Sequence, residues 1–334
     1  DGSPKQQRIR ASADHFRDIN NIGDLDAARL MREDGIDIAI DLKGYTENSR
    51  MQLLGMRPAP LQISYLGYPG STGADFLDYV IGDPVVTPLS HASHFSERIA
   101  QMPHSYQPND RRRGALPEVS RASQGLPEDA PVLCCFNQSY KITPEMADLW
   151  AEILRRSPRA VLWLLAWNET ARKGLTAEMA VRGIAAERLI FCARIGSEAN
   201  VARLQCADIF LDTWPCNAHT TASDALWAGV PVLTVPGETF ASRVAASLAQ
   251  ACELPAFVCD SPAAYVDKAV ALLDGQMAEL RAAQAQLRER RLALPLFDSQ
   301  RYARDFGALL SRMWARHEAG LAPDHLAAEA ALPG

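Results

Sequence analysis

The stretch IFLDTWPCNAHTTASDALWAGVPVLTVP, residues 209–236, joins two apolar runs through a polar loop and an amphipathic segment. The run 209–213 is short and bulky, as is typical of a buried strand. Apolar residues recur with helical spacing over 220–229, and 230–236 again resembles a strand. The stretch therefore predicts one β-α-β unit, with the polar segment 216–221 between its first strand and its helix.

The same alternation of short apolar runs and longer amphipathic segments continues along most of the chain. Strands that alternate with helices are parallel, are covered by helices on both faces and are joined by right-handed crossovers. We therefore predict an α/β fold with parallel sheets. After about residue 261 the pattern becomes wholly helical. Further strands are predicted at 36–42, 61–67, 132–137, 160–166 and 188–193, and further helices at 143–156, 169–184, 197–206 and 241–252.

A linker divides the chain into two predicted lobes. Residues 109–131 are rich in Arg, Pro, Ser and Gly and show no periodicity. We predict an N-terminal lobe over 1–126 and a C-terminal lobe over 127–297. Only three or four candidate strands precede the linker, so we expect the first lobe to be incomplete. A last helix, predicted within 298–320, has an apolar side that needs a partner surface, and we expect it to pack back on the first lobe.

Charge and hydropathy exclude several classes of partner. The chain has 334 residues, with 34 Lys and Arg against 40 Asp and Glu, and its net charge of -6 is spread without long runs of one sign. This pattern argues against a nucleic-acid partner. No apolar run approaches the roughly 20 residues of a membrane span, and the first residues lack the order of a secretory signal. We interpret the chain as cytoplasmic, without a membrane partner.

Two predicted strand ends have residues suited to phosphate. In open parallel sheets, ligands bind beyond the carboxyl ends of the strands, where the following helices point their N-termini. His219, Thr220 and Thr221 lie where one such helix begins, and its free N–H groups and dipole favour an anion. Gln138 and Lys141 follow the strand 132–137 in the same way. Together the two ends predict a clamp for a diphosphate.

Simpler interpretations of these residues remain open. Thr221 and Asp224 have the spacing of a capping box, in which case His219 is an ordinary loop residue and Lys141 is solvated. Neither GxxxxGK nor GxGxxG is present. The glycines of GYPGSTG, residues 67–73, fit either a turn at a strand end or a backbone that approaches a substrate closely. No His, Cys and carboxylate cluster with metal-ligand spacing lies near these motifs.

Several stretches resemble the catalytic region of O-linked N-acetylglucosamine transferases, including their bacterial homologues. The resemblance implies a two-lobed GT-B fold, with Rossmann-like lobes and a cleft between them. It also implies an inverting enzyme that uses UDP-GlcNAc without a metal or other cofactor and glycosylates Ser or Thr of a protein or peptide acceptor. The matching stretches are GYTENSR, RPAPLQISYLGYPGSTGADFLDYVI, FNQSYKI, LDTWPCNAHTTASDALWAGVPVLTVPGETFASRVAASL and PLFDSQRYARDF.

The resemblance also implies a role for individual residues. Lys141 and His219 are the candidate catalytic residues. Nucleotide and phosphate binding fall to Gln138, Lys141, His219, Thr220 and Thr221. Ribose binding falls to Asp224.

Other residues are expected around the base and the sugar. The backbone of Ile195 would meet the uracil, with Arg203 nearby, while Cys216 and Gly67 would face the sugar. Ser197 and Asn200 stand where the family often has Lys and His, which changes the uracil pocket.

The family's proposed acceptor-side Asp and His lie upstream, in a segment that follows tetratricopeptide repeats. We therefore expect this chain to be a fragment that such a segment completes. The alternatives are another GT-B glycosyltransferase, a nucleotide-sugar epimerase, or a UDP-sugar-binding module that is inactive without the upstream segment.

Overall fold

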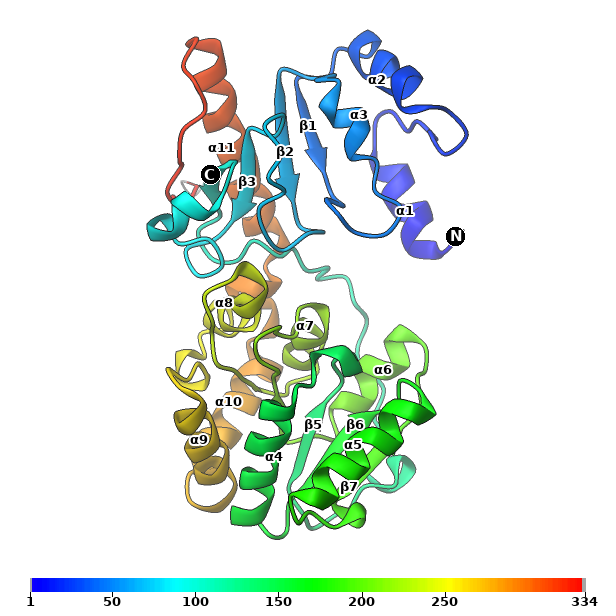
Figure 1. Ribbon diagram of the computed structural model, residues 1–334, viewed down its shortest axis with the longest axis vertical. Helices are drawn as coiled ribbons and strands as arrows, with labels where there is room; N and C mark the ends of the chain where they lie inside the picture. Colours follow the sequence, from blue (N-terminus) through cyan, green and yellow to red (C-terminus); the bar gives the residue numbers. More distant parts are fainter. Residues whose placement is uncertain (1, 332–334) are drawn as a thin grey trace.

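The computed structural model describes residues 2–331, which form two lobes, each built on a parallel sheet (Figure 1). The first sheet has the order β1-β2-β3-β4 and the second the order β7-β6-β5-β8-β9. The predicted α/β fold with parallel sheets is therefore confirmed. The strands are β1 (Ile38–Asp41), β2 (Leu61–Tyr65), β3 (Tyr79–Gly82), β4 (Arg98–Gln101), β5 (Val132–Cys135), β6 (Val161–Leu165), β7 (Leu189–Cys192), β8 (Ile209–Leu211) and β9 (Val232–Leu233).

The helices follow the predicted amphipathic segments closely in the second lobe. For example, α4 begins at Pro144, and the Thr143 side chain caps it by accepting a hydrogen bond from the Met146 N–H. The helices are α1 (Pro4–Ser12), α2 (Asp24–Glu33), α3 (Met51–Gly55), α4 (Pro144–Arg156), α5 (Glu169–Val181), α6 (Ser197–Leu204), α7 (Thr220–Trp227), α8 (Val244–Ala251), α9 (Pro262–Asp274), α10 (Met277–Glu289) and α11 (Ser299–Glu318).

The strand order of the second sheet places a switch point between β5 and β8. From β5 the chain runs outward to β6 and β7 through α4 and α5. It then crosses back through α6 to β8, on the other side of β5, and continues to β9 through α7. The loops that leave β5 and β8 therefore diverge from neighbouring strands, which is where open α/β sheets bind ligands.

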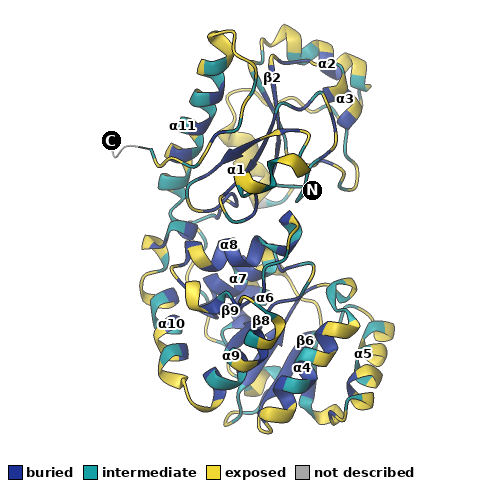
Figure 2. Ribbon diagram, turned by 60° about the vertical axis from the view of Figure 1, so that its left-hand side comes forward, coloured by how far each residue is buried: buried dark blue, intermediate teal, exposed yellow. Residues whose placement is uncertain are grey.

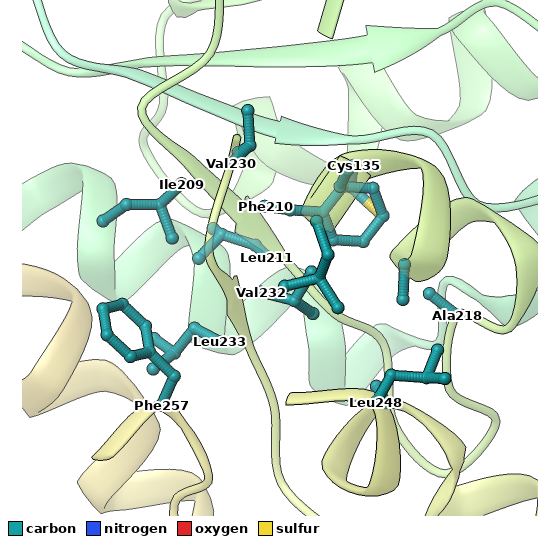
Figure 3. Close-up of a cluster of buried hydrophobic side chains, with 14 of the residues drawn as sticks. Cys135, Ile209, Phe210, Leu211, Ala218, Val230, Val232, Leu233, Leu248 and Phe257 are labelled. Carbon is teal, nitrogen blue, oxygen red and sulfur yellow. The ribbon is translucent and has the colours of Figure 1, made fainter. Parts of the chain in front are cut away.

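The second sheet is the main core of the molecule. Its strands are apolar, and all but the half-buried edge strand β7 are almost completely buried, as expected for parallel strands with helices on both faces (Figure 2). Phe210 and Val232 lie next to each other on β8 and β9, with Leu248 of α8 and Phe257 nearby (Figure 3). This packing fixes the positions from which the β5 and β8 loops emerge.

The last helix returns to the first lobe. The hydroxyl of Tyr302 in α11 donates to the Tyr106 carbonyl at 2.7 Å, and the Phe306 ring centroid lies 5.2 Å from that of Tyr65 in β2. Figure 1 shows α11 beside β3, away from α9 and α10. The linker instead packs on the second lobe, where Arg121 pairs with Asp208 at 2.8 Å.

A buried carboxylate joins the two lobes. Asp83 follows β3 and accepts hydrogen bonds from the Tyr106 N–H at 2.9 Å and from the hydroxyl of Ser247 in α8 at 2.7 Å. Burial raises the pKa of Asp83. At the opposite side of the first sheet, β1 is an edge strand that pairs only with β2 among the strands described.

Candidate functional site

Asn137 connects the loops that leave β5 and β8. It is 2% exposed, and its Nδ2 donates to Thr213 Oγ1 at 2.7 Å while its Oδ1 accepts from Thr221 Oγ1 at 2.6 Å. The indole of Trp167 donates to the Asn137 carbonyl at 2.7 Å. Asn137 is not among the residues predicted for the site, although a polar residue directly after a strand is a signal for one. We call Asn137, Lys141, His219, Thr220 and Thr221 the clamp.

Lys141 brings a positive charge to this junction. It ends the short 3₁₀ helix Ser139–Lys141, and its Nζ donates to the carbonyl of Asn217 in the β8 loop at 2.6 Å. The side chain is half-buried. A residue from the β5 loop is therefore held against the β8 loop, just before α7 begins.

The N-terminus of α7 completes the clamp. The helix begins at Thr220, and no side chain caps it. The first N–H groups of a helix lack intrahelical acceptors and favour an anion. The capping box suggested by Thr221 and Asp224 is wrong, because Thr221 bonds Asn137 and Asp224 pairs with Arg113 instead. Tertiary contacts across the loops outweigh this local pairing.

His219 is a neutral group in the clamp. Burial, and then the charge of Lys141, lower its pKa to about 4. Its Nε2 lies 3.3 Å from the Ala241 carbonyl. At neutral pH the imidazole therefore offers hydrogen bonds without a charge, and Lys141 is the cation among the clamp residues.

A buried carboxylate holds the β8 loop in place. Asp212 accepts hydrogen bonds from the Ala218 N–H and from Thr234 Oγ1, each at 2.6 Å. Burial raises the pKa of Asp212 to about 7, although its hydrogen bonds act in the opposite direction. Thr213 Oγ1 donates to the Cys216 carbonyl at 2.7 Å, so the half-buried Cys216 belongs to the same ordered loop.

Asp224 lies four residues along α7 from Thr220 and is tied to the linker. Arg113 donates to its Oδ1 at 2.6 Å, and burial raises the pKa of Asp224 against the effect of that arginine. The two residues are 111 positions apart. No local sequence pattern predicts this ion pair.

The residues expected near the uracil differ in their exposure and hydrogen bonding. Arg203 is 3% exposed, donates to the Ala193 carbonyl at 2.9 Å and to Asn200 Oδ1 at 2.6 Å, and stacks on the Phe136 ring. Arg203 and Asn200 therefore shape the β7–α6 loop. Ile195 on that loop and Ser197, the first residue of α6, are both exposed, so a ligand can reach them.

Gln138, expected at the nucleotide, and Gly67, expected on the sugar side, both lie outside the clamp. Gln138 is exposed beside it. Gly67 lies in the first lobe after β2, and a side chain there would place its Cβ 2.1 Å from the Leu42 carbonyl oxygen. Close packing of two backbone segments therefore explains why this position is glycine.

A pocket of about 600 Å³ adjoins the clamp between α4 and α5. Asn137, Ser139 and Tyr140 line it on the clamp side, while Leu164 and Phe191 form part of its apolar floor. Lys141 and the N-terminus of α7 do not line it. A phosphate needs their charge and N–H groups, so the clamp and not this pocket is the candidate anion site.

The described residues contain neither a metal-binding cluster nor a membrane-spanning helix. Within residues 2–331, no three His, Cys, Asp or Glu residues are grouped so as to hold a metal ion. No helix in the same part of the chain is both long and apolar enough to cross a membrane.

Known proteins resemble this chain over nearly all of its length. A protein of Arabidopsis thaliana named "Probable UDP-N-acetylglucosamine--peptide N-acetylglucosaminyltransferase SEC" is 38% identical over 331 residues, which cover 97% of this chain and 34% of that protein. A UDP-N-acetylglucosamine--peptide N-acetylglucosaminyltransferase of Caenorhabditis elegans is 30% identical and aligns with 98% of this chain and 38% of that protein. The chain thus spans little more than a third of either relative.

The fold also matches a solved structure. A mutant O-GlcNAc transferase from Thermobaculum terrenum superposes with a TM-score of 0.88 at 30% identity, covering 96% of this chain and 61% of that one. The predicted GT-B architecture is confirmed by this match. Residues 1–117 and 109–306 match the family model described as Glycosyl transferase family 41. The chain belongs to glycosyl transferase family 41.

Proposed function

We propose that this chain is the donor-binding part of a protein O-GlcNAc transferase, which moves GlcNAc from UDP-GlcNAc to Ser or Thr hydroxyls with inversion and without a metal ion. The observation that carries the proposal is the meeting of Lys141 with the α7 N-terminus at the switch point of the second sheet. The names of the two relatives support a UDP-GlcNAc donor and a peptide acceptor.

The proposed chemistry is a direct displacement at the anomeric carbon. The acceptor oxygen forms a bond to that carbon on one face while the bond to the β-phosphate oxygen breaks on the other, which inverts the configuration. The hydroxyl proton passes to a base on the acceptor side, and UDP leaves with the bonding electron pair. The negative charge that develops on the β-phosphate is the part of the transition state that this chain's clamp can stabilise.

Different clamp groups supply the charge and the oriented hydrogen bonds that stabilise the β-phosphate. Lys141 supplies a positive charge, and the first N–H groups of α7 supply aligned hydrogen bonds. Removing one such donor from a preorganised site costs roughly 3–4 kcal/mol of transition-state stabilisation. His219 contributes as a neutral hydrogen-bonding group. In this proposal a divalent cation is unnecessary because protein groups neutralise the leaving diphosphate.

Transfer of labelled GlcNAc to a peptide library tests the proposal. We would assay residues 1–334 alongside a protein that carries the upstream segment expected from the resemblance. Lys141→Ala is expected to lower kcat/KM of the active form by about 100-fold or more, because the charge acts mainly in the transition state. Lys173→Ala, at an exposed lysine on α5, is the matched control. Full activity of Lys141→Ala would refute the proposed role.

The same assay separates the alternatives. Formation of an isomeric UDP-sugar would indicate an epimerase, and UDP-sugar binding without turnover in either protein would indicate a binding module. Metal independence predicts equal transfer rates in excess chelator and in added magnesium. A large loss of rate in chelator, restored by magnesium, would contradict that part of the proposal.

A further inference from the structure

A second, basic pocket lies away from the clamp, where the chain crosses between the lobes. Its volume is about 450 Å³, within the range of roughly 300–1,000 Å³ common for small-molecule sites. One wall comes from linker residues 111–115 and another from residues 288–293, at the end of α10 and just beyond it. Five arginines line it, Arg111, Arg113, Arg288, Arg290 and Arg291, against the single exposed carboxylate of Glu289.

Three of the arginines already have acidic partners. Arg113 pairs with Asp224 at 2.6 Å, Arg290 with Glu253 at 2.9 Å, and Arg111 lies 3.9 Å from Asp298. Arg288 and Arg291 have no carboxylate within ion-pair distance among residues 2–331. Two guanidinium groups of one pocket wall are therefore left without an anion from the described part of the protein.

Two buried donors in the same pocket also lack acceptors. Arg291 Nε and the indole Nε1 of Trp227 are buried without a hydrogen-bond partner in the described structure. Trp227 is 2% exposed, and the guanidinium of Arg291 lies 4.9 Å from its ring centroid, with that of Arg113 at 5.4 Å. A buried donor without an acceptor destabilises the folded protein, so an anion bound beside these groups would be favoured.

The local charges repel one another in the absence of an anion. Burial, and then the charge of Arg288, lower the pKa of Arg291. The stem of Arg288 packs at Gly229, just after α7 ends, where the helix dipole offers only about half a negative charge. That partial charge cannot balance two guanidinium groups.

We propose that this pocket, which we call the arginine pocket, binds a small ligand with two or more adjacent phosphate groups. Guanidinium groups bind phosphate oxygens in pairs, and several within one pocket favour a ligand of high charge density. The guanidinium of Arg291, which lies over the Trp227 ring, places one of these groups in the pocket wall. The site is separate from the clamp, because Lys141 and residues 219–221 do not line it.

Calorimetry with inorganic pyrophosphate tests the proposal. The titration is run at low ionic strength into residues 1–334 saturated with UDP, which fills the clamp, and also into Lys141→Ala without UDP. One pyrophosphate site is expected in both. The double variant Arg288→Gln/Arg291→Gln should lower the affinity for pyrophosphate at least about 10-fold, equivalent to about 1.4 kcal/mol. The control variant Arg155→Gln/Arg281→Gln removes the same charge from exposed positions elsewhere. It should leave the affinity for pyrophosphate unchanged.

Several outcomes would overturn the proposal. An equal loss of pyrophosphate affinity in the two double variants would indicate a general charge effect. Pyrophosphate binding that disappears only with Lys141→Ala would place the site at the clamp. Binding of hexaglutamate but not pyrophosphate at the arginine pocket would assign it to acidic peptides instead. Arg288→Gln alone, at an exposed residue, is the check if the double variant does not fold. Because the second titration needs no UDP, failure of the proposed transferase function would not mask the result.

Discussion

Lys141 is the single residue on which the candidate site depends most. We expect Lys141→Ala to weaken UDP binding about 10-fold or more, because a charge-assisted contact worth roughly 1.4 kcal/mol or more is lost. Isothermal titration calorimetry with UDP measures this change. The variant also loses the bond from Nζ to the Asn217 carbonyl, so its melting temperature should be compared with that of the wild type.

Lys173→Ala is the control for the loss of one positive charge. Lys173 is an exposed lysine of α5, 3.7 Å from Glu169, and UDP affinity should not change when it is replaced. If both variants bind UDP as tightly as the wild type, the clamp is not where the diphosphate lies.

Asp212 makes the stability of the folded chain depend on pH. Burial raises the pKa of Asp212 from 3.8 to about 7 in the folded chain. Between these values the folded state keeps a proton that the unfolded state has lost, so the stabilisation is present at low pH and disappears as pH rises through 7. The free energy of unfolding of the wild type, relative to Asp212→Asn, should therefore fall from pH 5 to pH 8.

Urea unfolding of both proteins across that range gives the comparison. His219, whose pKa is lowered to about 4, has the opposite effect below about pH 6.5, but it is present in both proteins and cancels in the difference. A difference that stays constant from pH 5 to pH 8 would show that Asp212 is ionised throughout.

Among the elements, the loop that follows β2 is shaped by close backbone packing. Gly67→Ala would place a Cβ 2.1 Å from the Leu42 carbonyl oxygen, and backbone atoms cannot rotate away. We expect a loss of about 1–3 kcal/mol in the free energy of unfolding, typical of overpacking. Unfolding in denaturant measures this loss. Gly70→Ala is the control, because its nearest neighbour, at 3.6 Å, is the Tyr68 ring.

Glu97 restrains the loop that contains Gly67, so the loop cannot easily move to relieve the clash of an added Cβ. Glu97 is 1% exposed and accepts hydrogen bonds from Ser71 Oγ at 2.7 Å and from the Thr72 N–H at 2.8 Å, which hold the far end of the loop. Equal stability of Gly67→Ala and Gly70→Ala would mean that this loop moves freely.

Elements of the second lobe were predictable because their signals are local. The strand at 209–213 and the helix from Thr220 follow from apolar runs and helical spacing, and the Thr143 cap follows from Thr-Pro. The capping box at Thr221 and Asp224 failed because Asn137 and Arg113 compete for those side chains from distant loops. Such pairings depend on the folded sheet order, which single-sequence patterns do not contain.

At the scale of the whole molecule, the sequence indicated two parallel-sheet lobes and residues that gather at one switch point. It could not indicate that Arg203 is buried against Phe136, or that the linker contributes Arg113 to both Asp224 and the arginine pocket. Arg113 and Asp224, for example, are 111 positions apart. Such contacts determine which side chains remain available to a ligand.

Hydrogen–deuterium exchange with and without UDP shows directly whether the nucleotide binds at the switch point between β5 and β8. Amide protection should increase in 137–143 and 217–224, because the ligand accepts from these loops and restrains them. The loop 193–200 should change less, and the arginine-pocket segments 111–115 and 288–293 should not change. Protection confined to those two segments, or to the first lobe, would show that the nucleotide binds elsewhere.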